Sequence, residues 1–402
     1  MNDVTNLLRP NPAAAESDEI ISLANPQMQS GWDQLARHLP FYVSADWLHY
    51  SDRAGAAESR YVGVRQGDKL LAAVSTHWAP DEPSEEYIAR KIVSAPEGIG
   101  TVLTLGGRRG YVSAVLTASE LSAGEEARAL GSALSAAVAG VPETDGQWWW
   151  PYLHTCDLKR VLHAAATAGY ADASVHFIGA DCTIDIVGAS IDAYIAALPA
   201  AQRRTNFRRE RRRFTEAGLR IEEIPLANHW YELGPLLANV QRKYGHDHTD
   251  EQMRNVLQAQ AESLGGRAVV FACFQGESIT GFSLCYRWND ELALRVVGFD
   301  YTKIQNVDEY AMVAIHAPLD YCYRLGLKRL HLGVDSYESK LRRGAYLQPL
   351  WAVTSWPDFD PAIQASRENH LLSQLPKSEA QTFQQLVQQE RAMPSVLIQQ
   401  DV

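Results

Sequence analysis

The residues that most clearly suggest chemistry are the arginines of the segment LPAAQRRTNFRRERRRFTEAG. A guanidinium group presents a planar array of N–H donors that matches phosphate oxygens, and like charges one helical turn apart repel one another. The cluster therefore predicts contact with a polyanion such as RNA. The alternative is a solvated helix face whose arginines pair with acids of the same protein. The seven arginines, with one acid (Glu210) among them, are Arg203, Arg204, Arg208, Arg209, Arg211, Arg212 and Arg213.

A second candidate lies in GVDSYESKLRRG, where Asp335, Tyr337 and Lys340 form an Asp-x-Tyr-x-x-Lys pattern and Arg342 and Arg343 follow. Acyl transfer requires a base for the incoming nucleophile and a positive or hydrogen-bonding group for the developing oxyanion. Asp335 and Lys340 offer both. The alternative is an exposed loop in which these two residues form a surface ion pair of little consequence.

The segment KYGHDHTD places His246 and His248 two residues apart, just after Tyr244. A structural metal site needs four ligands that converge, so no metal site is predicted here. We interpret the segment as a loop followed by a helix that Thr249 caps. His316, inside an apolar helix, is interpreted as a buried core histidine.

The elements that must position these residues fall into two units of similar order. The first contains the hairpin RYVGVR/KLLAAVSTHW, a long helix with Ser119 as its N-cap, and the strand QWWWPYLH. The second contains the Arg-rich helix between Pro199 and Gly218, the hairpin RAVVFACFQ/SITGFSLCYRW, the strand ELALRVVGFDY, a helix from Asp308 to Leu325 and the strand KRLHLGV. The predicted organisation is a flexible lead-in (1–28), an N-terminal domain (29–176), a C-terminal domain (177–357) and a helical tail (358–402).

The second unit resembles the acyltransferase domain of the GNAT superfamily in its FemAB-like branch. The matching pieces are the Arg-rich helix, the hairpin followed by VVGFDY, and the Asp335, Tyr337, Lys340 pattern, within residues 181–356. FemAB-like proteins contain two such domains in tandem, and FYVSADWL resembles the opening of their first domain. The resemblance implies an α+β fold of two tandem GNAT-like domains, each with a mixed, mostly antiparallel sheet flanked by helices.

The resemblance also implies an activity, the transfer of an aminoacyl group from aminoacyl-tRNA to an amine, hydroxylamine or hydroxyl of a small molecule or peptide. Because the donor carries its own activated ester, no metal or other cofactor is expected. Lys340 and Arg343 would neutralise charge at the ester, and Asp335 or Asp300 would orient or deprotonate the acceptor. The other residues expected to contact substrate or tRNA phosphate are Arg203, Arg204, Arg208, Arg212, Tyr337, Arg342, Tyr244 and His246.

One loop departs from the usual GNAT pattern. Ordinary GNAT enzymes carry a glycine-rich loop here, whose backbone N–H groups bind the pyrophosphate of coenzyme A at a helix N-terminus. In this sequence the loop is TKIQNVDEY, without glycine, and Asp308 and Glu309 open the helix. Because these acids would repel a pyrophosphate, acyl-CoA is the alternative donor rather than the first choice. A module that only binds RNA is a further alternative, and Asp300 has its own alternative as a turn residue.

Composition sets the outer limits of function. The chain has 402 residues, 37 Lys+Arg and 48 Asp+Glu, so the formal net charge is 37 − 48 = −11. This balance disfavours a general nucleic-acid-coating protein or a membrane-surface protein, but it does not exclude a local basic patch.

Five scattered cysteines without a CxxC pair suit a reducing cytoplasm. Neither a secretory signal nor an apolar run near 18 residues is visible. No cell-wall-type helical hairpin is visible, which favours soluble acceptors, as in some antibiotic pathways.

Overall fold

The computed structural model describes residues 18–398 except 24, 29–30, 54 and 56. Most of the predicted lead-in lies outside the described residues, but Glu19–Leu23 form strand β1, so its later part is ordered into the sheet. No helix in the described part of the chain is long and apolar enough to cross a membrane.

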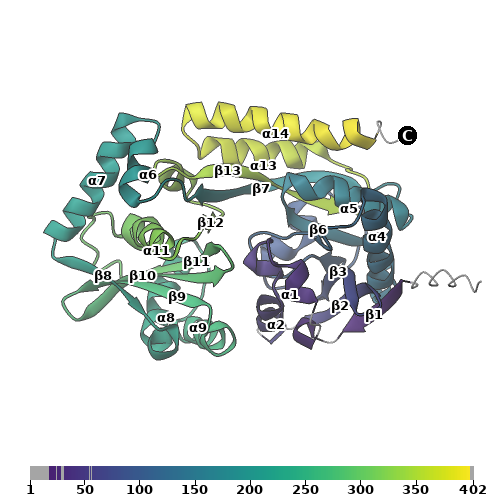
Figure 1. The fold of residues 1–402 in the computed structure, drawn as a ribbon, viewed down its shortest axis with the longest axis horizontal. Helices are drawn as coiled ribbons and strands as arrows, with labels where there is room; N and C mark the ends of the chain where they lie inside the picture. The colour runs from purple at the N-terminus through teal and green to yellow at the C-terminus, as the bar shows by residue number, and fades with distance from the viewer. Residues whose placement is uncertain (1–17, 24, 29–30, 54, 56, 399–402) are drawn as a thin grey trace, which may run out of the picture.

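The strands form one continuous mixed sheet with helices on both faces (Figure 1). Its order is β1-β2-β3-β4-β6-β13-β7-β12-β11-β10-β9-β8, and β5 pairs with β3. Antiparallel pairs predominate, and the pairs β4/β6 and β11/β12 are parallel. The strands are β1 (Glu19–Leu23), β2 (Glu58–Gln66), β3 (Lys69–Trp78), β4 (Leu103–Leu105), β5 (Leu116–Thr117), β6 (Trp148–Leu153), β7 (Ser174–Asp185), β8 (Leu219–Ile224), β9 (Ala268–Gln275), β10 (Ser278–Trp288), β11 (Glu291–Phe299), β12 (Arg329–Gly333) and β13 (Tyr346–Thr354).

The helices cover the sheet in two layers, each packed on its own apolar cluster. Helices α4, α5, α7, α11 and α14 pack on one face, and α1, α2, α8 and α9 pack on the other. The helices are α1 (Trp32–Leu35), α2 (Ala45–Arg53), α3 (Ala89–Ile92), α4 (Ala123–Ala139), α5 (Thr155–Thr167), α6 (Ile191–Ala197), α7 (Ala201–Glu216), α8 (Leu226–Lys243), α9 (Asp250–Leu264), α10 (Glu309–Ala311), the π-helix η5 (Met312–His316), α11 (Ala317–Leu325), α12 (Tyr337–Leu341), α13 (Pro361–Ser373) and α14 (Lys377–Ile398).

Strands β7 and β13 join the two halves of the molecule. Strand β13 pairs along its whole length with β7, and it also pairs with β6 through Trp351↔Leu153 and Val353↔Trp150. The last strand of the chain therefore lies beside a strand of the N-terminal half. The predicted boundary between residues 176 and 177 lies inside β7, so the two halves share one sheet rather than being linked by a loop.

Most local signals in the sequence predicted the right element. The Arg-rich helix begins after Pro199 and ends before Gly218, and Thr249 caps α9 with a capping box to Gln252. The predicted cap at Ser119 is wrong, because Ser122 caps α4 and forms a capping box with Glu125. That box satisfies backbone N–H groups at both positions, which a serine three residues earlier cannot do.

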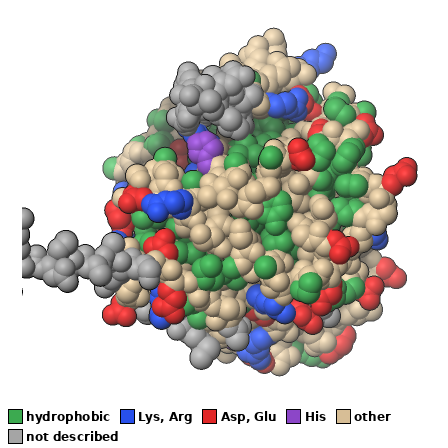
Figure 2. All heavy atoms as spheres, turned by 90° about the vertical axis from the view of Figure 1, so that its right-hand side faces the viewer, with side chains coloured by type: hydrophobic (Ala, Val, Ile, Leu, Met, Phe, Trp, Pro, Cys, Tyr) green, Lys and Arg blue, Asp and Glu red, His purple; other side chains and the backbone are tan. Residues whose placement is uncertain are grey.

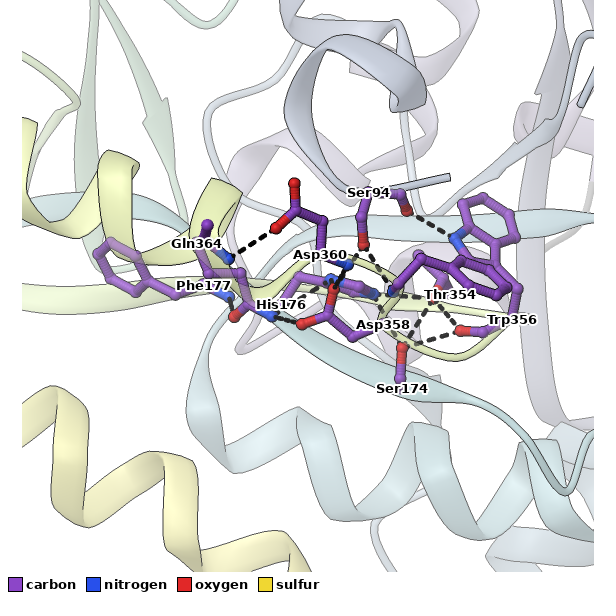
Figure 3. Close-up of polar contacts among 11 residues, drawn as sticks. Ser94, Ser174, His176, Phe177, Thr354, Trp356, Asp358, Asp360 and Gln364 are labelled. Carbon is purple, nitrogen blue, oxygen red and sulfur yellow. Dashed lines mark hydrogen bonds and ion pairs between the residues drawn. The ribbon is translucent and has the colours of Figure 1, made fainter. Parts of the chain in front are cut away.

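A polar cluster around His176 ties the start of α13 to the sheet (Figure 3). His176 is fully buried, and its Nε2 lies 2.9 Å from Ser174 Oγ and 3.0 Å from Thr354 Oγ1. Asp358 Oδ1 lies 3.8 Å from His176 Nδ1 and accepts a hydrogen bond of 2.5 Å from Ser94 Oγ. Burial lowers the pKa of His176 to about 4, so the ring is neutral near pH 7.

This cluster predicts a stability that depends on pH. His176 titrates near 6.5 when unfolded, so the unfolded chain takes up the proton first, and stability is lost as pH falls from about 6.5 toward about 4. We expect His176→Gln to reduce this loss by about 1–3 kcal/mol between pH 7 and 4.5. Denaturant unfolding of both proteins across that range measures it. Parallel curves for the two proteins would contradict the assignment.

Candidate active site

The candidate site begins where two parallel strands stop pairing. Strands β11 and β12 pair only from Glu291↔Arg329 to Ala293↔His331, although β11 continues to Phe299. Past this point β11 has no strand partner on that side among the described residues, which leaves a gap in the backbone pairing between the two strands.

Tyr111, from the N-terminal half, fills this gap. Its hydroxyl donates a hydrogen bond of 2.9 Å to the backbone carbonyl of Arg295 on β11. A Cβ atom at Gly333 on β12 would lie 2.9 Å from the Tyr111 ring, so only glycine fits there. The loop that carries Tyr111 is held by Trp47 Nε1, which donates to Arg108 O at 3.0 Å, and by the Tyr87 hydroxyl, which donates to Gly110 O at 2.6 Å.

Arg295 lies beside Tyr111 with an unusual set of neighbours. Its guanidinium carbon is 4.7 Å from the ring centre of Tyr111, 4.9 Å from that of Trp47 and 5.8 Å from that of Tyr42. Its Nε and Nη1 atoms are buried without a hydrogen-bond partner. Among the described residues no carboxylate lies within ion-pair distance of Arg295. The aromatic rings stabilise the cation, but nothing neutralises it.

His331 and Asp181 form a buried pair on the same face of the sheet. His331 Nε2 lies 2.7 Å from Asp181 Oδ1, and His154 Nε2 lies 3.4 Å from Asp181 Oδ2. Burial alone would lower the pKa of His331, but the Asp181 carboxylate raises it above its usual value overall. The Tyr42 ring lies edge-on to His331, with centroids 6.0 Å apart.

These five residues, Tyr42, Tyr111, Asp181, Arg295 and His331, are called the junction cluster. The Nε2–H of His331 faces Asp181, whereas its Nδ1 is buried without a partner, as is the Tyr42 hydroxyl. A histidine held in this way can take a proton at Nδ1, because the carboxylate fixes the tautomer and stabilises the imidazolium. Buried polar atoms without partners are rare in proteins and point to a missing ligand or water.

Two acidic residues at the start of α10, Asp308 and Glu309, make contacts that hold the loop between β11 and α10. The carboxylate of Glu309, which is buried, accepts hydrogen bonds from the backbone N–H of Gln305 at 2.5 Å and of Val307 at 2.8 Å. Asp308 pairs with Arg213 at 3.0 Å. A carboxylate of the chain itself therefore occupies two backbone N–H groups of this loop.

Two predicted catalytic residues, Asp300 and Lys340, form hydrogen bonds with residues near them in the chain. Asp300 accepts from the backbone N–H of Thr302 at 3.0 Å and its hydroxyl at 2.6 Å, as in the turn alternative. Lys340 is buried, and its ammonium donates to the carbonyls of residues 332, 333 and 334 at 2.7, 3.1 and 2.6 Å. Since an ammonium has three N–H bonds, Lys340 holds the end of β12 and has none left for an ester. Asp335 lies exposed just after that end, without an ion pair to Lys340.

The other residues of this segment are also tied to the protein. The Tyr337 hydroxyl donates to Ala180 O at 3.2 Å. Arg343 makes two hydrogen bonds, of 3.0 and 2.9 Å, to Glu210, which also lies 2.8 Å from His316 Nε2. His316 is fully buried, as predicted. Arg342 is exposed and pairs with Glu338 one helical turn away.

The Arg-rich helix α7 divides into paired and open arginines. Within the described chain, Arg203 pairs with Glu379, Arg211 with Asp320 and Arg213 with Asp308, so the alternative of internal pairing holds for these three. Arg204 donates to Leu198 O at 2.5 Å, and Arg212 lies 3.7 Å from Glu216 on the surface. Arg208 and Arg209 are exposed, with no side-chain partner among the described residues.

Tyr244 and His246 make no hydrogen bond, ion pair or ring contact with the residues of the junction cluster among the described residues. Both are exposed at the end of α8, and the His246 and His248 rings are stacked with centroids 6.0 Å apart. In the described part of the chain no group of three or more His, Cys, Asp or Glu side chains is arranged to hold a metal ion.

Comparisons with known proteins indicate the family of one part of the chain. Residues 201–341, from α7 to α12, match the family described as "Acetyltransferase (GNAT) domain". This part of the chain is a GNAT domain. It contains β11, β12 and the gap between them, so Arg295 and His331 belong to it. An enzyme of the acyltransferase kind is the general class to which such a domain points.

Solved structures share the fold of most of the chain. FemX has a TM-score of 0.54 at 10% identity, over 87% of this chain and 100% of FemX. The C-terminal domain of a putative lysylphosphatidylglycerol synthetase from Agrobacterium fabrum has a TM-score of 0.50 at 9% identity, over 82% and 92% of the two chains. A conserved protein of unknown function from Bacteroides thetaiotaomicron also has a TM-score of 0.50, at 12% identity over 77% and 89%. No curated protein sequence matches the chain. The predicted α+β, FemAB-like GNAT fold is thereby confirmed.

The junction cluster was not predicted from the sequence. Asp181, Arg295 and His331 each stand inside an otherwise apolar strand, in FIGADCTIDI, ELALRVVGF and KRLHLGV. An ionisable residue in a strand that is buried on both faces is costly unless it is paired or functional. That signal was present in the sequence. Arg108, in the loop that carries Tyr111, lies buried in an ion pair of 2.9 Å with Glu82.

Proposed function

We propose that this protein transfers an aminoacyl group from aminoacyl-tRNA to a nucleophile of a small molecule or peptide. The observation that carries the proposal is the Glu309 carboxylate, which occupies the backbone N–H groups of the loop at which a GNAT domain would hold the pyrophosphate of coenzyme A. An anion already in place makes a CoA donor costly. An aminoacyl ester needs no such loop. FemX and the C-terminal domain of a putative lysylphosphatidylglycerol synthetase share the fold. The name of the second protein's product describes a lipid that carries an amino acid.

The junction cluster supplies the groups that this reaction needs. The acceptor nitrogen or oxygen attacks the ester carbonyl while its proton passes to Nδ1 of His331, and Asp181 stabilises the resulting imidazolium. Burial raises the pKa of Tyr42 well above its usual value, so its hydroxyl keeps its proton and can donate to the developing oxyanion. The ester C–O bond then breaks, and His331 returns the proton to the ribose oxygen of the tRNA.

The open arginines of α7 supply a contact for tRNA phosphate. Figure 2 views the opposite end of the molecule, beside α4 and β1, where basic side chains are scattered among acidic and apolar ones. Arg208 and Arg209 instead stand next to each other on one exposed helix.

We expect the double substitution of Arg208 and Arg209 by alanine to weaken tRNA binding at low salt. The slope of log K against log salt should fall by about 1.4–1.8, because each phosphate contact contributes about 0.7–0.9. Filter binding at several salt concentrations measures this slope. Arg203→Ala is a matched control, since that side chain is engaged by Glu379. Equal slopes for the double variant and the wild type would place the tRNA contact elsewhere.

The test of the proposed function compares donors in one assay. Purified protein is incubated with a mixture of amines and hydroxylamines and either tRNA charged with labelled amino acids or labelled acetyl-CoA. We expect label to leave one or a few aminoacyl-tRNAs and not acetyl-CoA. Transfer from acetyl-CoA would overturn the donor assignment. Binding of tRNA without transfer from either donor would favour a module that only binds RNA.

A further inference from the structure

The guanidinium of Arg295 is the largest unbalanced charge in the junction cluster. Its Nε and Nη1 atoms are buried without partners, and no carboxylate of the described chain lies within ion-pair distance. A buried charge without a counter-charge is strongly unfavourable. Buried Arg108, by contrast, has a counter-charge, because it forms an ion pair of 2.9 Å with Glu82. Arg295 lacks such a carboxylate.

The surroundings of Arg295 are shaped for an anion rather than for a neutral group. Tyr42, Trp47 and Tyr111 place their rings around the guanidinium, and none of them carries a negative charge. Burial, together with the charges of Arg108 and Arg295, lowers the pKa of Arg109, so a further cation is close by. Excess positive charge among these aromatic rings favours a ligand that brings a negative charge.

We propose that Arg295 binds a carboxylate of the acceptor, so that the acceptor is an amine that carries a carboxylate, such as an amino acid. This inference rests on the proposed function and names the acceptor class for it. One guanidinium matches one planar, singly charged carboxylate in charge and geometry. A phosphate ester is the other source of such oxygens, and it carries up to two charges.

The position of Arg295 relative to His331 supports this assignment. Both side chains lie on the same face of adjacent strands, because Ala293 pairs with His331 and Arg295 lies two residues further along β11. The ring of Tyr42 lies against both, at 5.8 Å from the guanidinium carbon and 6.0 Å from the imidazole centre. A carboxylate on Arg295 would therefore place a nearby amine on the side of His331, the proposed base.

The experiment measures binding without any donor, using the full-length protein. Thermal shift and calorimetric titration are carried out with the twenty common amino acids, with the amine that results from removing the carboxyl group of each, and with phosphoethanolamine. We expect at least one amino acid to bind about tenfold or more tightly than its decarboxylated amine. If every amine binds as well as its parent amino acid, or if no amino acid binds, the proposal is overturned. Preferential binding of phosphoethanolamine would overturn it in favour of a phosphate.

Variants assign the effect to Arg295. Arg295→Lys keeps the charge but changes its geometry, and we expect about a tenfold loss of amino acid affinity; Arg295→Met should abolish binding. Arg287→Lys, on the exposed face of β10, is the matched control and should bind normally. Unchanged affinity in Arg295→Lys and Arg295→Met would contradict the proposal. If aminoacyl transfer to some amine persists while carboxylates show no preference, this inference fails and the proposed function stands.

Discussion

Replacing His331 with glutamine is expected to lower the rate constant of aminoacyl transfer by about 10²–10⁴. The imidazole is the group of the junction cluster that can both take and return a proton near neutral pH, and its Nδ1 is buried without a partner. Glutamine keeps a hydrogen bond toward Asp181 but cannot titrate. Single-turnover transfer from aminoacyl-tRNA measures the effect directly.

The control for this prediction is His370→Gln, which changes an exposed histidine of α13 and should leave transfer unchanged. Circular dichroism and thermal unfolding establish that His331→Gln still folds. A folded His331→Gln protein with wild-type turnover would remove His331 from the chemistry.

The pH profile of transfer should report the same histidine. Burial lowers the pKa of His331, but the neighbouring carboxylates, Asp181 first among them, raise it above its usual value overall, so the neutral base appears only as pH rises through that raised pKa. Glu291 also raises this pKa and Lys340 lowers it. In Asp181→Asn the main raising charge is gone, so the acid limb should move to lower pH while the maximum rate falls. An acid limb that stays in place would contradict the pairing.

The second large effect concerns stability. Lys340→Met is expected to reduce the free energy of unfolding by about 2–5 kcal/mol, because three backbone carbonyls at the end of β12 lose their donor in a buried place. The loss should appear in denaturant unfolding whether or not a substrate is present. A catalytic lysine would instead give slow turnover at normal stability.

Lys328→Met is the matched control, since Lys328 is exposed just before β12. We expect its stability to lie within about 0.5 kcal/mol of the wild type. Should Lys340→Met be as stable as this control, the ammonium is not holding the strand end, and the original expectation of a role at the ester would regain support.

Local patterns in the sequence predicted much of the fold. The hairpins over Gly67 and Gly276, the break at Pro199 and the cap at Thr249 depend on residues close together in the chain. The pairing of β13 with β6 of the N-terminal half was not predicted, because strand order depends on contacts between residues far apart in sequence. The GNAT fold itself was predicted by resemblance, from the order of elements and a few motifs.

The site was predicted less well, for a physical reason. Asp181, Arg295 and His331 lie on three strands separated by long stretches of sequence, and Tyr42 and Tyr111 come from the other half. No spacing rule connects such residues. Lys340 was singled out from its motif as a residue that acts at the ester. Its three contacts to backbone carbonyls could not be predicted, because they depend on the folded end of β12.

The most direct test of the account is a structure of the protein with a stable analogue of the aminoacyl end of tRNA, an adenosine that carries its amino acid through a 3′-amide. We predict that the acyl carbonyl lies in the gap between β11 and β12, beside His331 Nδ1 and the Tyr42 hydroxyl, with Tyr111 displaced. The loop at residues 305–309 should keep its Glu309 contacts. An analogue bound elsewhere, or coenzyme A bound with its pyrophosphate in place of the Glu309 carboxylate, would contradict the account.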